Sequence, residues 1–303
     1  QVGVEIGGGV GLHYHYGTLG QLQHGENYAT AYLRTIGADS SRSRPLKVWP
    51  YKKGSKVKLF VLAGHRNMEG ERAFVQELKT LKGKAALLKD NPKIAYKYNL
   101  GGGYKTSNGW EPLGLTGYYD TFGPELSFAQ ILQGEVPGNI AIAKFTHSGS
   151  QIIDWTPEGS MAKSRHIYPE FIDFIKESVQ ELEAKGHEVE LIGIFYHFGE
   201  NDMSFHPYRK QAAERLQTII AKSRKDLEWL ALKWYVSQQP PPDDKSVNNI
   251  DVVANIAMAA AVDPTLIHLK TFNLPRQEKK LVLSTAGIVE LGEVIAKSYL
   301  GHQ

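Results

Sequence analysis

Short apolar runs alternate with longer amphipathic segments from Lys56 to the end of this 303-residue chain. The runs fall at 57–63, 138–145, 188–196, 232–237 and 265–269. Apolar runs of this length predict strands that are buried on both faces. Because helices are expected between them, the strands should lie parallel and be joined by right-handed helical crossovers. The sequence therefore predicts an α/β protein built on a parallel sheet.

Four segments have the apolar spacing of helices. In residues 168–185, Phe171, Ile175 and Leu182 share one face, and Gly186 follows as a stop signal. The other three predicted helices are 206–223, 247–262 and 284–299. The last of these begins with Ser284 and Thr285, which are good N-cap residues.

Two regions lack such a pattern. Residues 1–55 are rich in glycine and aromatic residues, and we expect an irregular or β-rich extension packed on the core. Residues 56–303 are expected to form the main domain. Within it, residues of about 80–137 are expected to form a long insertion at the rim of the sheet. Such an insertion either shapes a substrate cleft or forms a structural layer of loops.

Composition excludes several classes of function. The chain has no cysteine, which excludes disulfides, thiolate metal sites and a cysteine nucleophile. The net charge is +3, and no block of basic residues suggests nucleic-acid binding. No apolar run is long enough to span a membrane. Because the chain starts at Gln1, we expect that a leader was removed or that the N-terminus was trimmed, and that the protein is secreted or periplasmic.

Polar segments follow three of the predicted strands directly. They are Gly64–Met68, His147–Ser150 and His197–Asp202. Ligands of an open parallel sheet bind at the carboxyl ends of its strands. We therefore expect these three segments to meet at one rim and to form the site.

The segment Gly64-His65-Arg66-Asn67-Met68 resembles the nucleophile turn of the SGNH hydrolases. The likeness is to the branch of sialate O-acetylesterases and acetylxylan esterases, which have Gly-Gln-Ser-Asn-Met there. The resemblance runs from about residue 56 to residue 300. It implies a three-layer, flavodoxin-like SGNH fold and a carbohydrate ligand. In this chain Arg66 stands where the family has the serine that attacks the ester.

Further blocks carry the same resemblance. Residues 122–128 are similar to the family's Gly-Pro-Glu-Leu segment, and Gly123 falls on the glycine whose amide helps to bind the oxyanion. Residues 142–150, with Asp154-Trp155 after them, resemble the strand and Gly-Gly-Thr/Ser turn. Residues 195–202 resemble Trp-x-Gln-Gly-Glu-x-Asp, and Asn201 there is a suitable oxyanion donor.

The last block, 281–287, resembles the family segment that carries the catalytic aspartate and histidine. Counting back from Gly287, the histidine position is Val282 and the aspartate position is Lys279. Ester attack needs an activatable hydroxyl, a base and an orienting carboxylate. Because Arg66 stays protonated and Val282 cannot move a proton, the resemblance implies that the serine-dependent mechanism is lost.

Three functions remain open. In the first, the chain binds an anionic or acetylated polysaccharide without cleaving it. Arg66 would then offer a planar fork of donors to an anionic group, and aromatic residues such as Tyr118 would stack on sugars. The other candidate binding residues are Asn67, Gly123, His147, Asn201, His206, Trp110 and Trp155.

In the second, a repurposed glycan-cleaving enzyme uses the carboxylates of Glu200 and Asp202, with His65 or another histidine as a proton shuttle. In the third, a residual acetylesterase uses Ser148, Ser150 or Ser204 with a nearby histidine.

Other interpretations of the polar residues are structural. Arg66 can form an internal salt bridge to Glu200 or Asp202 and so fill a disused pocket. His13, His15 and His24 could hold a metal ion, but they are more often surface or packing residues where no third ligand is clear. We therefore expect neither a metal nor a cofactor.

Overall fold

The computed structural model describes residues 3–5, 14–16, 44, 46–117, 120–161, 165–204, 206–238, 250–269, 271, 273–277 and 282–302. The chain divides into two compact units, residues 1–44 and 45–303, and each is described by itself. In the first unit, β1 (Gly3–Glu5) pairs antiparallel with β2 (Tyr14–Tyr16). The expected boundary after residue 55 and the packing of the extension on the core stay predictions.

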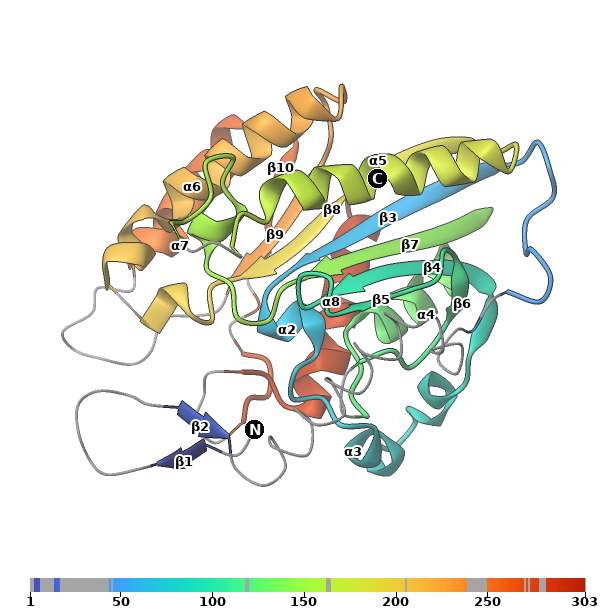
Figure 1. Ribbon diagram of the computed structural model, residues 1–303, viewed down its shortest axis with the longest axis horizontal. Coiled ribbons are helices and arrows are strands. Elements are labelled where there is room, and N and C mark those ends of the chain that lie inside the picture. Colours follow the sequence, from blue (N-terminus) through green and yellow to red (C-terminus); the bar gives the residue numbers. More distant parts are fainter. Residues whose placement is uncertain are drawn as a thin grey trace, which may run out of the picture. The chain divides into compact units, whose positions relative to one another are not determined.

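The second unit is built on a sheet that is mostly parallel (Figure 1). Its strands are β3 (Lys56–Gly64), β4 (Asn91–Leu100), β5 (Lys105–Thr106), β6 (Glu111–Leu113), β7 (Asn139–Thr146), β8 (Glu188–Phe198), β9 (Trp234–Gln238) and β10 (Leu266–Leu269). Their order is β10-β9-β8-β3-β7-β4-β5, and β6 also pairs with β4. From β10 to β4 all neighbours are parallel, whereas β5 and β6 run antiparallel to β4. The predicted parallel sheet is confirmed.

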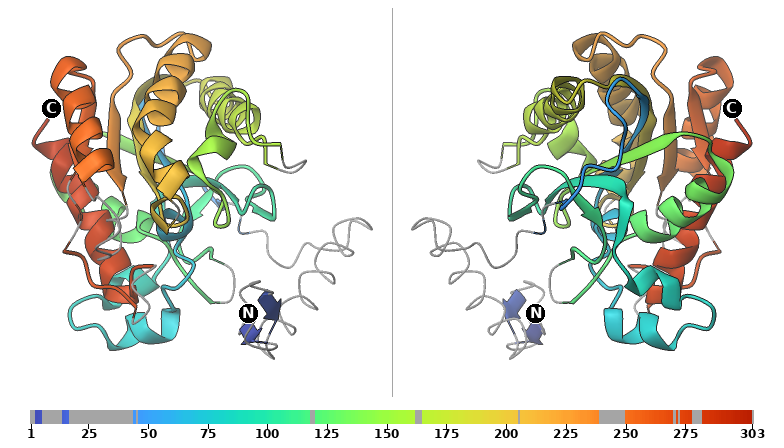
Figure 2. Two further views of the ribbon diagram at one scale, coloured as in Figure 1. Left: turned by 90° about the vertical axis from the view of Figure 1, so that its left-hand side faces the viewer. Right: turned by 90° about the vertical axis from the view of Figure 1, so that its right-hand side faces the viewer.

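Helices cover both faces of this sheet. They are α2 (Arg66–Glu69), α3 (Val75–Thr80), α4 (Glu125–Glu135), α5 (Tyr168–Ala184), α6 (His206–Asp226), α7 (Ile250–Val262) and α8 (Thr285–Leu300), with the 3-10 turns η1 (Ala85–Leu88), η2 (Ile152–Trp155) and η3 (Asp202–Ser204). One apolar core joins the sheet to α5, α6 and α7, and a second joins it to α3, α4 and α8. Figure 2 shows α5 and α8 on opposite sides of the sheet. The architecture is the predicted three-layer α/β fold.

Each of the five predicted strands and four predicted helices has a counterpart in the structure, although residues 247–249 lie outside the described part. Further elements come from the region 80–137, in which the sequence has no clear period, and the longest of them are β4 and α4. In β4, Ile94, Tyr96 and Tyr98 alternate on the α8 side. Lys97 interrupts the apolar run, and it is buried because its amine reaches Glu181 at 2.7 Å. Whether the rest of this region shapes a substrate cleft stays a prediction.

In α4, two polar residues occupy the buried face and hide the helical period. Glu125 pairs with Lys144 on β7, and Ser127 donates to the backbone oxygen of Val289 at 2.8 Å. The pattern of apolar residues alone therefore misses a helix whose buried face is completed by polar contacts.

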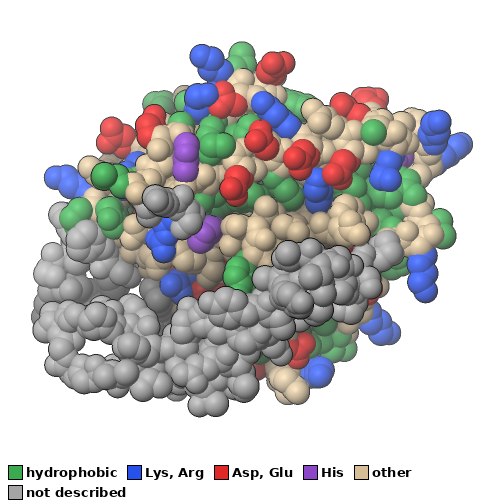
Figure 3. All heavy atoms as spheres, in the orientation of Figure 1, with side chains coloured by type: hydrophobic (Ala, Val, Ile, Leu, Met, Phe, Trp, Pro, Cys, Tyr) green, Lys and Arg blue, Asp and Glu red, His purple; other side chains and the backbone are tan. Residues whose placement is uncertain are grey.

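The described surface mixes both signs of charge. On the face drawn in Figure 3, acidic and basic side chains are interspersed along the upper helical layer. Among the residues that the structure describes, no helix is both long enough and apolar enough to cross a membrane.

Candidate functional site

The three predicted site segments meet at the carboxyl ends of three adjacent strands. Gly64, the last residue of β3, lies opposite Thr146 of β7 and His197 of β8. The backbone amide of His147 donates to the oxygen of Gly64 at 3.0 Å, and that of His65 donates to the oxygen of His197 at 3.0 Å. The predicted convergence at one rim is confirmed.

Gly64 makes the sharp turn from β3 into α2. Its φ is 145°, and a Cβ there would lie 2.0 Å from the backbone oxygen of His197. Only glycine allows the ends of β3 and β8 to approach this closely. The turn therefore fixes where the next side chains, those of His65 and Arg66, leave the sheet.

Arg66 is held by groups of the protein itself. Its Nη1 donates to both carboxylate oxygens of Glu71, at 2.8 and 2.9 Å, and its Nε donates to Oδ1 of Asn201 at 3.2 Å. The side chains of Arg66 and Glu71 are 26% and 25% exposed. The expected salt bridge to Glu200 or Asp202 is therefore wrong, because the chain turns Glu71 back to the guanidinium first.

Glu71 is a site residue that the sequence did not reveal. The short helix α2 ends at Gly70, whose left-handed backbone (φ 86°) returns the chain toward Arg66. The hydroxyl of Ser148, after β7, also donates to Glu71. The spacing of five residues between Arg66 and Glu71 does not by itself predict a contact, because the contact depends on the reversal of the chain at Gly70.

The two expected oxyanion donors already donate hydrogen bonds to acceptors within the protein. The amide of Gly123 donates to Glu125 at 3.2 Å. The Nδ2 of Asn201 donates to the backbone oxygens of Gly149 at 3.2 Å and Ser150 at 2.9 Å. Their role toward a ligand stays a prediction, and it would require these bonds to be exchanged.

Asn67 connects the nucleophile turn to the last block of the chain. Its Oδ1 accepts from the amide of Leu283 at 2.8 Å, and its Nδ2 lies 3.1 Å from Nε2 of His197. The neighbouring Val282 is 8% exposed and aliphatic. Position 282 is therefore held close to α2, but its aliphatic side chain cannot act as a base. Lys279 lies outside the described residues.

Glu200 and Asp202 are buried below the rim. Neither side chain is exposed; Glu200 accepts from the amide of Asn67 at 2.6 Å and Asp202 from that of Ile152 at 3.0 Å. Burial raises the pKa of Glu200 to about 8 and that of Asp202 to about 7, against the effect of these hydrogen bonds. Fully buried carboxyl groups cannot flank a glycosidic bond, which argues against the catalytic role expected for them.

His65 lies beside both carboxyl groups and is equally buried. Its Nδ1 is 3.8 Å from an oxygen of each, and it accepts from the amide of Gly199 at 3.4 Å. Its Nε2 is 3.1 Å from the Tyr196 hydroxyl. Burial lowers the pKa of His65 well below its ordinary value, so the ring is neutral. His65 is therefore placed as a structural acceptor and not as a shuttle open to a substrate.

The expected aromatic contacts to sugars are also inside the protein. Trp155 is fully buried and stacks on His65 with ring centroids 5.8 Å apart, and Trp110 is 6% exposed. This burial argues against direct stacking on a ligand. Tyr118 lies outside the described residues, and the side chain of His206, the first residue of α6, is not described.

His147 is the candidate histidine that reaches the rim. It is partly exposed, and the glycine turn after β4 packs on its ring. The packing is close: a Cβ added at Gly102 would lie 2.5 Å from Cδ2 of His147. Burial, followed by the charge of Arg165, lowers its pKa. The side chain of Arg165 is 40% exposed and lies 3.8 Å from Asp154.

These blocks can now be compared with known proteins. Residues 56–301 match the family described as carbohydrate esterase, sialic acid-specific acetylesterase. The chain belongs to this family. No curated protein sequence matches the chain.

Solved structures agree with this carbohydrate esterase fold. A protein from Arabidopsis thaliana has a TM-score of 0.59 at 18% identity, over 82% of this chain and 99% of that one. NanS has a TM-score of 0.61 at 13% identity, over 83% and 98%. A carbohydrate acetylesterase from Xanthomonas citri has a TM-score of 0.58 at 14% identity, over 79% of this chain and 55% of its own length. At these identities the likeness shows the fold alone.

Beneath the esterase-type turn, one carboxyl group connects the parts of the rim. Oε2 of Glu69, in α2, accepts from the amides of Gly101 at 3.0 Å and Ser148 at 3.1 Å and from the hydroxyl of Thr146 at 3.1 Å. Burial, followed by the charge of Glu71, raises the pKa of Glu69 to about 7. Glu69 thus sets the spacing of the loops after β4 and β7.

The serines proposed for a residual esterase make other contacts. Ser148 donates to Glu71, and Ser150 donates to the backbone oxygen of His147 at 2.7 Å and accepts from Trp155. The side chain of Ser204 is not described. Neither Ser148 nor Ser150 therefore has a histidine ring among its hydrogen-bond partners.

A metal site has little support in the described part of the chain, where no three His, Asp or Glu side chains form a group that could hold a metal ion. His13 and His24 lie outside the described residues, and of His15 only the backbone is described, in β2.

Proposed function

We propose that this chain is a carbohydrate-binding member of the esterase family that does not hydrolyse acetyl esters by the serine mechanism. The observation that carries the proposal is the state of Arg66. The resemblance assigns it to the position of the nucleophile, and its guanidinium is joined to Glu71 and Asn201. A guanidinium stays protonated and cannot attack an ester.

The position of Val282 supports the same conclusion. The resemblance assigns the family's histidine to position 282, and the bond from the amide of Leu283 to Asn67 supports this by holding that segment close to α2. An aliphatic side chain cannot accept the proton of an attacking hydroxyl. A single replacement of Arg66 would therefore not restore hydrolysis.

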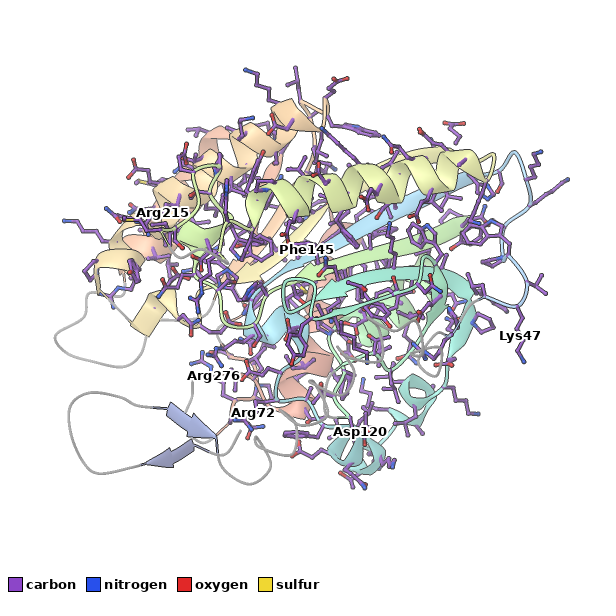
Figure 4. The ribbon with its side chains drawn as sticks, viewed as in Figure 1. Lys47, Arg72, Asp120, Phe145, Arg215 and Arg276 are labelled. Atoms are coloured by element: carbon purple, nitrogen blue, oxygen red, sulfur yellow. The ribbon has the colours of Figure 1, made fainter. Side chains whose placement is uncertain are left out.

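Basic groups at the rim support an anionic polysaccharide as the ligand. Arg72 is exposed, Arg165 is 40% exposed, and Arg276 is close enough to His197 to lower its pKa. Figure 4 places Arg72 and Arg276 on the side of the molecule where the strands end. Carbohydrate as the ligand class rests on the family and on the acetylesterase from Xanthomonas citri, which is described as acting on carbohydrate.

Binding and hydrolysis can be separated in one experiment. The full chain is incubated with immobilised anionic and neutral polysaccharides, some of them acetylated, while released acetate and new reducing ends are measured. We expect retention on an anionic polysaccharide with neither product. Sustained acetate release, above all release that vanishes in Ser148→Ala, or reducing ends that vanish in Glu200→Gln, would overturn the proposal.

A matched pair of variants tests the basic rim. Arg72→Met should weaken retention on the anionic polysaccharide, and the retention should fall with salt because exposed charges are screened. Lys79→Met, which removes an exposed charge from α3, is the control and should leave retention unchanged. Equal losses in both variants would mean that the attraction is general and not located at the rim. Secretion or a periplasmic location stays a prediction.

A further inference from the structure

Large apolar side chains are exposed at the end of the sheet that lies opposite the rim. Trp229 and Leu230 lie in the turn between α6 and β9, and Met258 and Val262 lie in the last turns of α7. Leu230 is 79% exposed and Val262 is 83% exposed. Both helices run from the rim to this opposite end (Figure 1). Exposed apolar side chains that gather on one surface mark a place where another molecule binds.

The composition of α7 agrees with a covered helix more than with an exposed one. From Val252 to Val262 its only polar side chain is that of Asn255. A helix that is apolar nearly all round is expected to be buried on all sides. In this chain only one face is buried, by packing in the core that α5 and α6 share, and the residues Met258, Ala261 and Val262 of α7 are exposed. The outer face of α7 is therefore suited to a partner.

Arg224 fixes the turn after α6 to the end of α7. Its Nη1 donates at 2.6 Å to Oδ2 of Asp263, the residue that follows Val262, and its Nη2 donates to Thr265 at 2.6 Å. Its backbone oxygen accepts from the amide of Trp229 at 2.9 Å. The apolar residues of the two segments are thus held in one preformed surface. We call this surface the end patch, and it consists of Trp229, Leu230, Met258 and Val262.

The edge of the end patch carries one charge of each sign. Lys225 is exposed and Glu228 is partly exposed, and both belong to the end of α6. Within the described part of the chain neither forms an ion pair, whereas the nearby Lys222 is paired with Asp226. In a contact with two-fold symmetry, each residue of one copy meets its counterpart's partner in the other. A patch with an acidic and a basic residue at its edge is therefore complementary to itself.

The backbone at Glu228 gives independent support for a use of its side chain. Its φ is 57°, in the left-handed region. The amide of Glu228 donates to the oxygen of Lys225 at 3.1 Å, and the amide of Trp229 donates to that of Arg224, which is the helix ending at which glycine is usual. A residue with a side chain is less favourable there than glycine. The chain nevertheless has a carboxylate at this position, at the edge of the patch.

We propose that the end patch is the contact between two copies of this chain in a two-fold dimer. Leu230 and Val262 pack against the other copy, and Lys225 of each copy pairs with Glu228 of the other. A lipid surface would instead call for an excess of basic residues at the edge. A standard interface takes about 800 Å² from each partner, so a patch of four large side chains with a charged edge supports a weak, concentration-dependent dimer. Because the patch is at the end of the sheet opposite the rim, both candidate sites stay open.

Sedimentation velocity of the full chain tests the dimer. Between about 1 and about 100 μM the sedimentation coefficient of the parent should rise toward that of a dimer. Leu230→Asp puts a charge into the contact and should hold the coefficient at the value of the monomer. Met161→Asp makes the same kind of change at a fully exposed side chain in the loop after η2, at the rim, and should behave as the parent does.

Charge reversal tests the geometry of the contact. Lys225→Glu alone and Glu228→Lys alone each place like charges opposite one another, so each should weaken the dimer about tenfold or more. The two changes together in one chain should restore it. A mixture of the two single variants should also form dimers, with one copy of each, because both contacts then join opposite charges. Restoration of this kind does not occur where a variant has merely lost its fold.

Four results would overturn the inference. The first is a parent that stays monomeric up to about 100 μM. The second is a dimer that persists unchanged in Leu230→Asp, which would place the contact elsewhere on the chain. The third is a mixture of the two single variants that stays monomeric. The fourth is a monomeric parent that sediments with vesicles of phosphatidylserine and phosphatidylcholine and loses this property in Leu230→Asp, which would assign the end patch to a lipid surface.

Discussion

Nη1 of Arg66 donates to both carboxylate oxygens of Glu71, at 2.8 and 2.9 Å, at the turn that follows β3. The two charges are about three quarters buried, and Asn201 adds a third contact to the guanidinium. Because the two opposite charges offset each other, the pair adds little net charge to the rim. Arg66 is therefore better described as part of the wall of the site than as a free anion receptor.

The first prediction concerns the strength of this pair. A double-mutant cycle with Arg66→Met and Glu71→Gln should give a coupling free energy of about 1 kcal/mol, because the pair is partly shielded from solvent but still screened. Urea denaturation measures it, and added salt should reduce it. The exposed pair of Lys56 and Glu190, at 3.2 Å, is the matched control and should couple more weakly. Equal coupling in the two cycles would mean that burial at the rim adds nothing.

The second prediction is a loss of stability at alkaline pH that depends on Glu200. Its pKa is about 8 in the folded protein and near 4.5 in the unfolded chain. Between these values the folded state holds a proton that the unfolded state has lost, so stability falls as pH rises from about 4.5 through 8. Each unit of pKa difference corresponds to about 1.4 kcal/mol. The unfolding free energy of Glu200→Gln should therefore decline less than that of the parent between about pH 6.5 and about pH 8.5.

Glu183→Gln controls for the loss of one negative charge, since Glu183 is exposed on α5. It should reproduce the pH profile of the parent. The buried histidines act in the opposite direction: burial lowers the pKa of His65 well below 6.5 and that of His197 to about 3, so stability rises with pH through this acid range. If the unfolding free energies of the parent and of Glu200→Gln fall in parallel above about pH 6.5, the loss of stability does not come from Glu200.

The rim could be predicted from sequence because parallel strands end at a common edge. Polar segments after three apolar runs were enough to bring Gly64, Thr146 and His197 together. The partners of the side chains were not predictable in this way. Glu71 reaches Arg66 only because a helix of one turn ends in a left-handed glycine, and a one-turn helix has no period to detect.

The burial of Trp155 was likewise beyond the reach of sequence pattern. A tryptophan just after a rim turn is a reasonable candidate for stacking on a sugar, but η2 directs this ring inward, where Ser150 accepts its N–H at 2.9 Å and His65 stacks on it. The direction of a side chain in a short irregular turn depends on tertiary packing. Family resemblance predicts where such a residue lies along the fold, whereas tertiary packing decides whether its side chain faces a ligand or the core.

The third prediction concerns the strict need for glycine at the entrance to α2. Gly64→Ala would put a Cβ 2.0 Å from the oxygen of His197, at a φ of 145°, so it should cost about 3 kcal/mol or more. Gly54→Ala is the control, because its φ is also positive, at 79°, but nothing lies within 4 Å of the added atom. That variant should cost about 1 kcal/mol. Similar midpoints in urea for the two variants would show that the sheet yields at Gly64.

The fourth prediction concerns the buried pair below Gly123. Nζ of Lys144 donates to Glu125 at 2.7 Å, and both side chains are almost fully buried. Lys144→Met leaves an uncompensated carboxylate and should destabilise the protein by about 3 to 5 kcal/mol. Adding Glu125→Gln should recover part of this loss, since neither side chain of the pair then carries a charge. A double variant that is less stable than Lys144→Met would show that Glu125 is needed for another reason, such as its bond to the Gly123 amide.

The fifth prediction tests the connecting role of Glu69. Because its Oε2 accepts from the amides of Gly101 and Ser148, Glu69→Gln replaces an acceptor with a group that can turn a donor toward them. Hydrogen exchange at these two amides should speed up by about tenfold or more, which is the loss of one charge-assisted hydrogen bond. The amide of Val136, which donates to Leu132 at the end of α4, should exchange as in the parent. Faster exchange at all three sites would indicate general destabilisation. Faster exchange at the rim alone would show that the loops after β4 and β7 are held by this one carboxyl group, independently of the core beneath them.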